Sequence, residues 1–111
     1  MNNDSPVFSA ISAQIKQDDI VLYMKGNKQF PQCGFSSALV SILNNLKAKF
    51  ITVNVLENQE IREGIKKFSN WPTIPQLYIK GEFVGGCDIV KEMYKEGELQ
   101  ELLNKKNLVT I

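Results

Sequence analysis

Ile20-Val21-Leu22-Tyr23-Met24 is the longest uninterrupted apolar run in this 111-residue chain, and the other predicted elements are arranged around it. Its β-branched and aromatic members predict a buried strand. A polar loop over residues 25–32 follows, and apolar residues at helical spacing then predict a helix from about Cys33 to Lys47. A second β-branched run, over residues 50–55, predicts another strand. Together they form a strand–helix–strand unit, which is typical of α/β domains.

Helical spacing recurs on both sides of this unit. Before it, the apolar pattern predicts an amphipathic helix over residues 6–17, with Ser5 as N-cap and Pro6 at the first helical position. After it, Asn58 can cap a helix. The apolar residues that predict the inner side of this helix are Ile61, Ile65 and Phe68.

Two short strands, over residues 76–80 and 82–84, meet at Lys80-Gly81 and predict a hairpin. Asp88 can then cap a further helix, and Gly97 separates this helix from a last one. The predicted order α-β-α-β-α-β-β-α-α favours one mixed sheet with helices on both faces. We expect an α/β fold and a single domain over residues 1–111, because this length leaves no room for a second domain.

The charge and hydropathy of the chain argue against two classes of partner. Thirteen basic and twelve acidic side chains give a net charge of +1, whereas general nucleic-acid binders show a strong basic excess. The longest apolar run is far too short to cross a bilayer. The first residues contain neither a basic nor an apolar stretch, so we expect no export signal. We therefore expect a soluble protein with no nucleic-acid partner and no membrane partner.

Two features of the composition limit the chemistry. The chain has no histidine, which excludes Cys–His and Ser–His–Asp catalysis within it and any histidine-ligated metal. It has two cysteines, Cys33 and Cys87, so one chain cannot supply four sulfur ligands to zinc or to an iron–sulfur cluster. Any such site needs a second chain, an external thiol, or both.

Cys33 is predicted to lie where the loop gives way to a helix. Unpaired N–H groups at a helix start stabilise an anion, and such positions lower the pKa of a cysteine from about 8.5 to roughly 3.5–7.5. Lys25 can add a positive charge near the sulfur. Both features favour the thiolate, which attacks disulfides and binds soft metals. The alternative is a buried structural cysteine, but the neighbouring residues are typical of exposed turns and caps: Pro31, Gly34 and Ser36.

Cys33-Gly34-Phe35-Ser36 has the spacing of a C-x-x-C redox motif, with serine in place of the second cysteine. No disulfide can form within this motif. A mixed disulfide on Cys33 must then be resolved by an outside thiol such as glutathione, or by Cys87. This weakens the case for a dithiol oxidoreductase and favours a role in which one sulfur holds a ligand.

Three motifs stand in order along the chain: Lys25 with PQCGFS at residues 31–36, WPTIPQ at residues 71–76, and GGCD at residues 85–88. With these motifs, the chain resembles the monothiol glutaredoxins of the CGFS class, in their single-domain bacterial or mitochondrial form, from about residue 6 to residue 104. The resemblance implies a thioredoxin-like fold, in which helices flank a four-stranded mixed sheet. It also implies a cis peptide bond before Pro75. Trp71 is expected either to set the turn and shield a bound group, or to be ordinary core.

The resemblance assigns a glutathione site to particular residues. The glycyl carboxylate of glutathione is expected to meet Lys25 and Arg62, because a guanidinium group matches a carboxylate; from the sequence alone, Arg62 would be taken for a solvated helix charge. The backbone of Ile74 is expected to pair with the cysteinyl unit like an added strand. The N–H of Cys87 and the N–H and carboxylate of Asp88 are expected to receive the γ-glutamyl end, and the two preceding glycines to let the ligand come close.

The resemblance further implies that Cys33 binds a [2Fe–2S] cluster shared with a second subunit. Two Cys33 sulfurs and two glutathione sulfurs then complete four ligands. The implied function is to carry the cluster to apo iron–sulfur client proteins, as a cluster-bridged homodimer or with a BolA-like protein. The expected location is a bacterial-type cytoplasm or the mitochondrial matrix.

Two other functions remain open from the sequence. One is a glutathione-dependent thiol–disulfide oxidoreductase, in which Cys33 attacks a glutathionylated protein and at most weak turnover is expected. The other is a redox-sensing interaction module without metal. A disulfide between Cys33 and Cys87 under oxidation is a further hypothesis.

Overall fold

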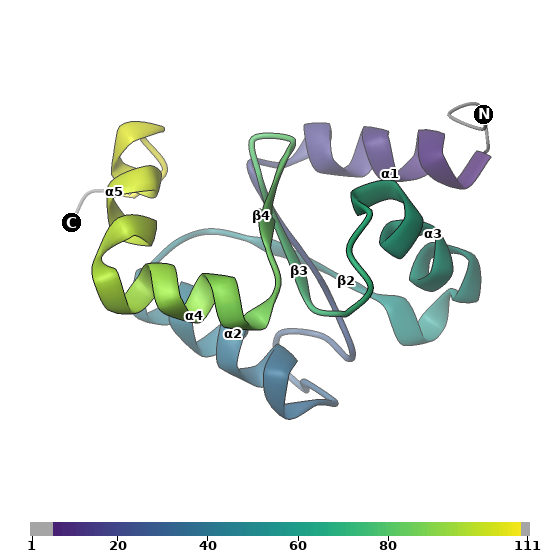
Figure 1. Cartoon of the computed structure of the whole chain (residues 1–111), viewed down its shortest axis with the longest axis horizontal. Helices are drawn as coiled ribbons and strands as arrows, with labels where there is room; N and C mark the ends of the chain where they lie inside the picture. The colour runs from purple at the N-terminus through teal and green to yellow at the C-terminus, as the bar shows by residue number, and fades with distance from the viewer. Residues whose placement is uncertain (1–5, 110–111) are drawn as a thin grey trace.

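A four-stranded sheet between two layers of helices makes up the computed structural model, which describes residues 6–109 (Figure 1). The strands lie in the order β2-β1-β3-β4; β1 pairs parallel with β2 and antiparallel with β3, and β3 pairs antiparallel with β4. The predicted mixed sheet is therefore confirmed. The elements are α1 (Pro6–Gln17), β1 (Ile20–Met24), α2 (Gly34–Asn45), β2 (Ile51–Asn54), the 3₁₀ helix η1 (Val55–Glu57), α3 (Gln59–Ser69), β3 (Gln76–Ile79), β4 (Glu82–Gly85), α4 (Cys87–Glu96) and α5 (Glu98–Lys105).

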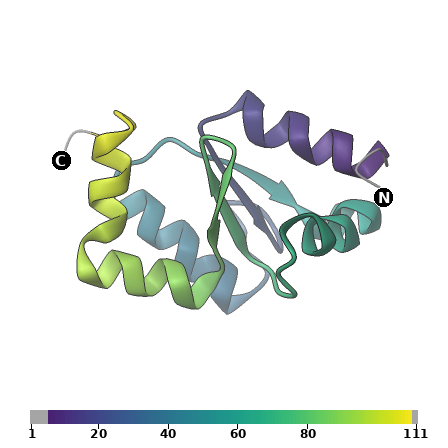
Figure 2. The ribbon, with the colours of Figure 1, turned by 45° about the horizontal axis from the view of Figure 1, so that its top comes forward.

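The central strand β1 is buried along its whole length because helices cover both of its faces. Its side chains alternate between two cores. One core lies under α2, α4 and α5 and receives Ile20, Leu22 and Met24. The other lies under α1 and α3 and receives Val21 and Tyr23. Figure 2 shows these two helical layers on opposite sides of the sheet. The unbroken apolar run is thus the signature of a strand with no solvent-facing side.

The predicted elements are all present, with small differences at their ends. The strand predicted at residues 50–55 is shorter, because Val55 begins the 3₁₀ helix η1. The cap at Asn58 is confirmed: its Oδ1 accepts a hydrogen bond from the Ile61 N–H at 3.1 Å. The expected cap at Asp88 is wrong, because Gly86 is the N-cap of α4 and Asp88 lies in its first turn. The cap predicted at Ser5 lies outside the described residues. None of the helices between residues 6 and 109 has the length and apolar character that crossing a bilayer requires.

Asn54, at the end of β2, ties two neighbouring segments together through one oxygen. Its Oδ1 accepts from the Gly26 N–H at 2.9 Å, in the loop after β1, and from the Leu56 N–H at 3.0 Å, in η1. Side-chain oxygens that accept from otherwise unpaired backbone donors are the usual way in which loops and helix starts are stabilised.

Asn54→Ala is therefore expected to lower the free energy of unfolding by about 1–3 kcal/mol, because two backbone N–H groups lose their acceptor. Equilibrium urea unfolding followed by circular dichroism measures this change. Asn44→Ala, on the exposed side of α2, is the matched control and is expected to change the value by less than about 0.5 kcal/mol. Equal stabilities of the two variants would contradict the assigned role of Asn54.

Candidate functional site

Cys33 lies at the junction between the loop after β1 and helix α2. It is the N-cap residue of α2, with extended backbone angles (φ −157°, ψ 138°). Its carbonyl oxygen accepts a hydrogen bond from the Ser37 N–H at 2.9 Å. The side chain is partly exposed and forms no disulfide in the described chain. The alternative of a sealed structural cysteine is therefore wrong, and the thiol can be reached by another molecule.

Ser36, at the fourth position of the motif, is fully buried. Its Oγ accepts a hydrogen bond from the backbone N–H of Lys25 at 3.1 Å, which joins the end of β1 to the first turn of α2. The expectation that Ser36 belongs to an exposed turn is wrong, because this bond draws the hydroxyl group inward. The motif therefore combines one accessible sulfur with one structural oxygen.

The pKa of the Cys33 thiol is lowered from its ordinary value. The backbone N–H of Ser36 is the largest cause; the Phe35 N–H, the Lys25 ammonium and the Ser36 hydroxyl act in the same direction, and partial burial opposes them. The Cys33 side chain does not accept a capping hydrogen bond from the first N–H groups of α2. The thiolate is thus favoured by N–H groups that point toward it from the first turn and by a nearby positive charge.

The loop over residues 25–32 folds into a small hairpin before Cys33. Gly26 and Pro31 form an antiparallel bridge at its base, and Asn27 and Phe30 exchange backbone hydrogen bonds of 3.1 and 3.3 Å. Gly26 has φ +89°, and a Cβ there would lie 2.4 Å from the Phe30 carbonyl oxygen. Only glycine fits at this point, so the hairpin depends on it.

The two most exposed large apolar side chains among residues 6–109 flank Cys33 in the chain. Phe30, in the hairpin, is 71% exposed, and Phe35, in the first turn of α2, is 61% exposed. Exposed apolar groups that gather near a reactive side chain often mark a place where another molecule binds. The surroundings of Cys33 therefore suit a site that a ligand or a second protein covers.

A cavity of about 190 Å³ lies between the segment that precedes β3 and the start of α4. Three of the residues expected to bind glutathione line it, namely Ile74, Cys87 and Asp88. Burial is the main reason that the pKa of Cys87 is raised, and Cys33 adds to it electrostatically, so the two sulfurs lie in the same neighbourhood. The other lining residues are Phe35, Trp71, Thr73, Pro75 and Gly86.

Arg62 is one of three expected site residues, with Cys33 and Lys25, that do not line this cavity. It is half-buried on α3, outside the residues that line the cavity. Ile74, Cys87 and Asp88 line the cavity, and so does Phe35, two residues after Cys33. Lys25 lies near enough to Cys33 to contribute to its lowered pKa. The structure therefore brings most of the expected site together from the end of β1, the start of α2, the turn before β3 and the start of α4.

Trp71 forms a wall of the cavity, so it is not ordinary core, and that it shields a bound group stays a prediction. The side chain is half-buried, and its ring centroid lies 5.9 Å from that of Phe83. A Cβ on Gly86 would lie 2.8 Å from Trp71 Nε1, so the indole occupies the space that a larger residue would need. The absence of a side chain at Gly86 therefore leaves room for the indole of Trp71, in addition to the room for a ligand that was expected from the sequence. The peptide bond between Ile74 and Pro75 is cis, as the resemblance implied.

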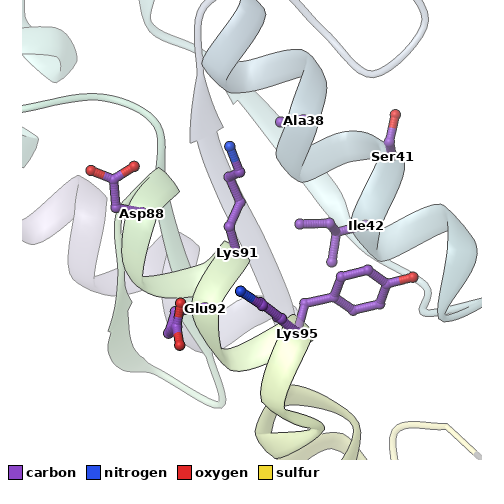
Figure 3. A pocket seen from close by; sticks show the side chains of 8 residues that line it. Ala38, Ser41, Ile42, Asp88, Lys91, Glu92 and Lys95 are labelled. Atoms are coloured by element: carbon purple, nitrogen blue, oxygen red, sulfur yellow. The ribbon is translucent and has the colours of Figure 1, made fainter.

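A second, larger groove of about 750 Å³ runs between α2 and α4 and shares Asp88 with the cavity (Figure 3). Helix α4 contributes Lys91 and Lys95 to it. Lys91 lowers the pKa of the Cys87 thiol, but burial raises it more, so the net direction is upward. The pKa values of the two thiols are therefore shifted in opposite directions, that of Cys87 upward and that of Cys33 downward.

Comparison with known proteins agrees with this geometry. The family model described as glutaredoxin matches residues 20–84. The chain is 57% identical to a protein of Rickettsia typhi named "Probable monothiol glutaredoxin 2", over 84% of each chain. It is 54% identical to "Monothiol glutaredoxin-5, mitochondrial" of Schizosaccharomyces pombe, over 88% of this chain and 69% of the relative. The solution structure of reduced poplar apo GrxS14 superposes with a TM-score of 0.81 at 51% identity, covering 95% of this chain and 96% of that one.

The chain belongs to the monothiol glutaredoxins. The thioredoxin-like fold expected from the sequence is confirmed by the sheet order, by the helices on both faces and by the poplar structure. Its relatives include a bacterial protein and a mitochondrial one.

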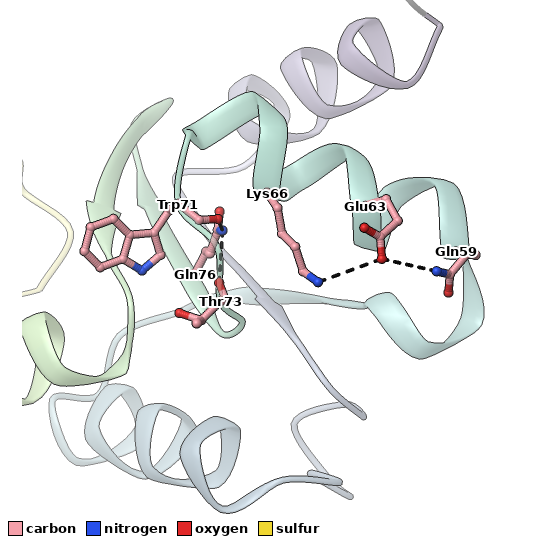
Figure 4. Close-up of polar contacts among 6 residues, drawn as sticks. All are labelled: Gln59, Glu63, Lys66, Trp71, Thr73 and Gln76. Atoms are coloured by element: carbon pink, nitrogen blue, oxygen red, sulfur yellow. Dashed lines mark hydrogen bonds and ion pairs between the residues drawn. The ribbon is translucent and has the colours of Figure 1, made fainter.

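Sequence reasoning missed three residues of this glutaredoxin's site. Phe35 and Thr73 line the cavity, and Gln76 is fully buried directly behind the turn that forms one wall (Figure 4). A glutamine at an inward-facing position of an apolar strand was the available signal, because a buried amide must find partners. The identity of those partners depends on the fold of the turn, which the sequence pattern does not give.

The opposite pKa shifts of the two thiols predict different pH profiles for alkylation. The thiolate is the reactive form, so the rate rises as pH passes the pKa, and a lowered pKa moves the midpoint to lower pH. In Cys87→Ser, the midpoint for Cys33 is expected below the ordinary value of about 8.5. In Cys33→Ser, the midpoint for Cys87 is expected above that of Cys33, because burial raises the pKa of Cys87. Iodoacetamide labelling followed by mass spectrometry measures both.

Lys25→Gln separates the two sources of the Cys33 shift. The N–H of Ser36 is the largest cause and remains in this variant, so the midpoint is expected to rise only part of the way toward the ordinary value. A return to the full ordinary value would show that the lysine charge, and not the helix start, controls the thiolate.

Proposed function

We propose that this glutaredoxin binds glutathione in the cavity beside Cys33 and carries a [2Fe–2S] cluster, held between two copies of the chain, to apo iron–sulfur proteins. The main support is Cys33: it is partly exposed, it lies at the start of α2, and its pKa is lowered. A lowered pKa favours the thiolate, which is the form that binds a soft-metal cargo. The motif contains no second thiol that would convert it into a disulfide.

The lining of the cavity supports a particular placement of glutathione. The cysteinyl unit pairs with the backbone of Ile74, which brings its sulfur toward Cys33. The γ-glutamyl end meets the N–H groups of Cys87 and Asp88, which lie in the first turn of α4 and have no partner inside that helix. The glycyl carboxylate meets the charged ends of Lys25 and Arg62.

The sulfur count supports a shared cargo. Each chain supplies one sulfur, from Cys33, and each bound glutathione supplies another, so two chains and two glutathiones provide the four ligands of a [2Fe–2S] cluster. Cys87 is poorly suited as a ligand, because burial raises the pKa of its thiol. The second copy would also cover Phe30 and Phe35, and a BolA-like protein can take its place. Free thiols persist in reducing compartments, which fits a bacterial-type cytoplasm or the mitochondrial matrix.

Glutathione-dependent oxidoreductase activity is the second candidate, and the lowered pKa of Cys33 favours it. The Cys33 thiolate would attack a glutathionylated protein, form a mixed disulfide with glutathione and release the protein thiolate. A second glutathione thiolate would then attack this disulfide, which regenerates Cys33 and yields glutathione disulfide. Ser36 cannot act as a resolving thiol, so each turnover requires that external glutathione.

Anaerobic reconstitution with iron, sulfide and glutathione tests the carrier function. The wild-type chain is expected to develop the visible charge-transfer bands of a cluster and to double in mass by native mass spectrometry. Both changes are expected to be absent in Cys33→Ser and when glutathione is omitted. Cys87→Ser is the matched control, and it is expected to retain the bands and the dimer.

Two results would contradict the carrier function. One is a colourless monomer that rapidly reduces a mixed disulfide of glutathione, which would support the oxidoreductase instead. The other is a cluster that forms equally well without glutathione, since the four-sulfur arrangement would then be wrong.

A further inference from the structure

Gln76 is fully buried at the start of β3, and its side-chain amide is hydrogen-bonded at both ends. Figure 4 shows the end that faces Trp71 and Thr73. Its Nε2 donates to the carbonyl oxygens of Trp71 and Thr73, each at 3.1 Å. Its Oε1 accepts from the Tyr78 hydroxyl at 3.2 Å. The donor half of the amide therefore faces the turn before β3, and the acceptor half faces the strand. Leaving buried polar groups without partners is costly, so the position of the turn is coupled to this side chain.

The turn that Gln76 holds, residues 70–75, forms one side of the cavity, through Trp71, Thr73, Ile74 and Pro75. Its first part is also attached to the end of α3, where the Trp71 N–H donates to the Lys66 carbonyl and to Ser69 Oγ, both at 3.1 Å. The two hydrogen bonds from Gln76 hold the same turn through its carbonyl oxygens, those of Trp71 and Thr73.

The other side of the cavity is built by a different part of the chain, the start of α4. Gly86, Cys87 and Asp88 line it there. The Trp71 indole lies close to Gly86 across the two sides, since a Cβ added at Gly86 would lie 2.8 Å from Nε1. The width of the cavity is therefore set by where the turn lies relative to α4.

We propose that Gln76 is a positioning residue for glutathione: it does not line the cavity, but it holds Trp71 and Thr73 at the separation from α4 that the tripeptide requires. This inference rests on the proposed glutathione site. The two bonds to the turn matter for affinity, whereas the bond to Tyr78 matters only for the stability of the strand. The two halves of the amide can be removed separately, which makes the assignment testable.

Three variants of the full chain separate these roles. Gln76→Met keeps the approximate volume and removes all three hydrogen bonds. Gln76→Glu keeps an acceptor for Tyr78, but it can donate to the turn only while its carboxyl group is protonated. Tyr78→Phe is the matched control, because it removes the partner of Oε1 and leaves both donors on the turn. The measurement is titration of the reduced apo chain with reduced glutathione, followed by NMR, with a thermal unfolding midpoint for each variant.

Gln76→Met is expected to bind glutathione at least about fivefold more weakly than the wild type, since two hydrogen bonds to the turn are lost. Tyr78→Phe is expected to lower the unfolding midpoint and to bind with unchanged affinity.

For Gln76→Glu, the affinity relative to wild type is expected to fall as pH rises from about 5 to about 8, because an ionised carboxylate repels the two carbonyl oxygens and burial raises its pKa into this range. Tyr78 does not titrate there, because burial raises its pKa to about 12. Comparison with wild type at each pH removes the contributions of Cys33 and Cys87.

The inference is overturned if Gln76→Met binds as tightly as the wild type, or if Gln76→Glu follows the wild-type pH profile. It is also overturned if Tyr78→Phe loses as much affinity as Gln76→Met, since reduced stability would then explain both. If Gln76→Met does not fold, the pH profile of Gln76→Glu decides alone. A wild-type chain that does not bind glutathione would instead contradict the proposed function, so the two failures are distinguishable.

Discussion

The hydrogen bond between the Lys25 N–H and Ser36 Oγ joins the central strand to the first turn of α2. Strand β1 is buried on both faces, so its end cannot shift without disturbing two cores. The first turn of α2 is therefore attached to the strand that is buried on both faces, and Cys33 lies between the two attached residues in the chain. The position of the sulfur relative to the N–H groups of α2 follows from this constraint, and it does not require the loop to be rigid by itself.

The two cysteines show that the start of a helix does not by itself make a reactive thiol. Cys33 is the N-cap of α2, and Cys87 is the first residue of α4. The pKa of the first is lowered, mainly by the Ser36 N–H, whereas that of the second is raised by burial and by Asp88. Both sulfurs are partly exposed, so a helix start lowers the pKa of a thiol only where burial and a neighbouring carboxylate do not outweigh its field. One domain thus holds a thiol suited to binding and another suited to remaining inert.

Much of the fold could be predicted from the sequence, because the apolar pattern of β1 and the helical spacing on either side of it are local signals. The parts that could not be predicted depend on contacts between distant residues. Ser36 is buried because it meets a backbone donor eleven positions earlier. Asp88 follows the usual pattern of a helix cap, but α4 begins one residue before it. The reach of Arg62 depends on how α3 is placed against the cavity. The partners of Gln76 could not be predicted for the same reason, since they are backbone carbonyl groups of a turn whose conformation the sequence pattern does not give.

The indole of Trp71 stands where a side chain at position 86 would be. These two positions therefore share a single volume, although they are fifteen positions apart in the chain. Any lineage that acquired a larger residue at position 86 would need a smaller one at position 71, or a wider separation between the turn before β3 and the start of α4. Paired substitutions, with a larger residue at position 86 and a smaller one at position 71, would therefore change the shape of the cavity and could admit a bulkier thiol.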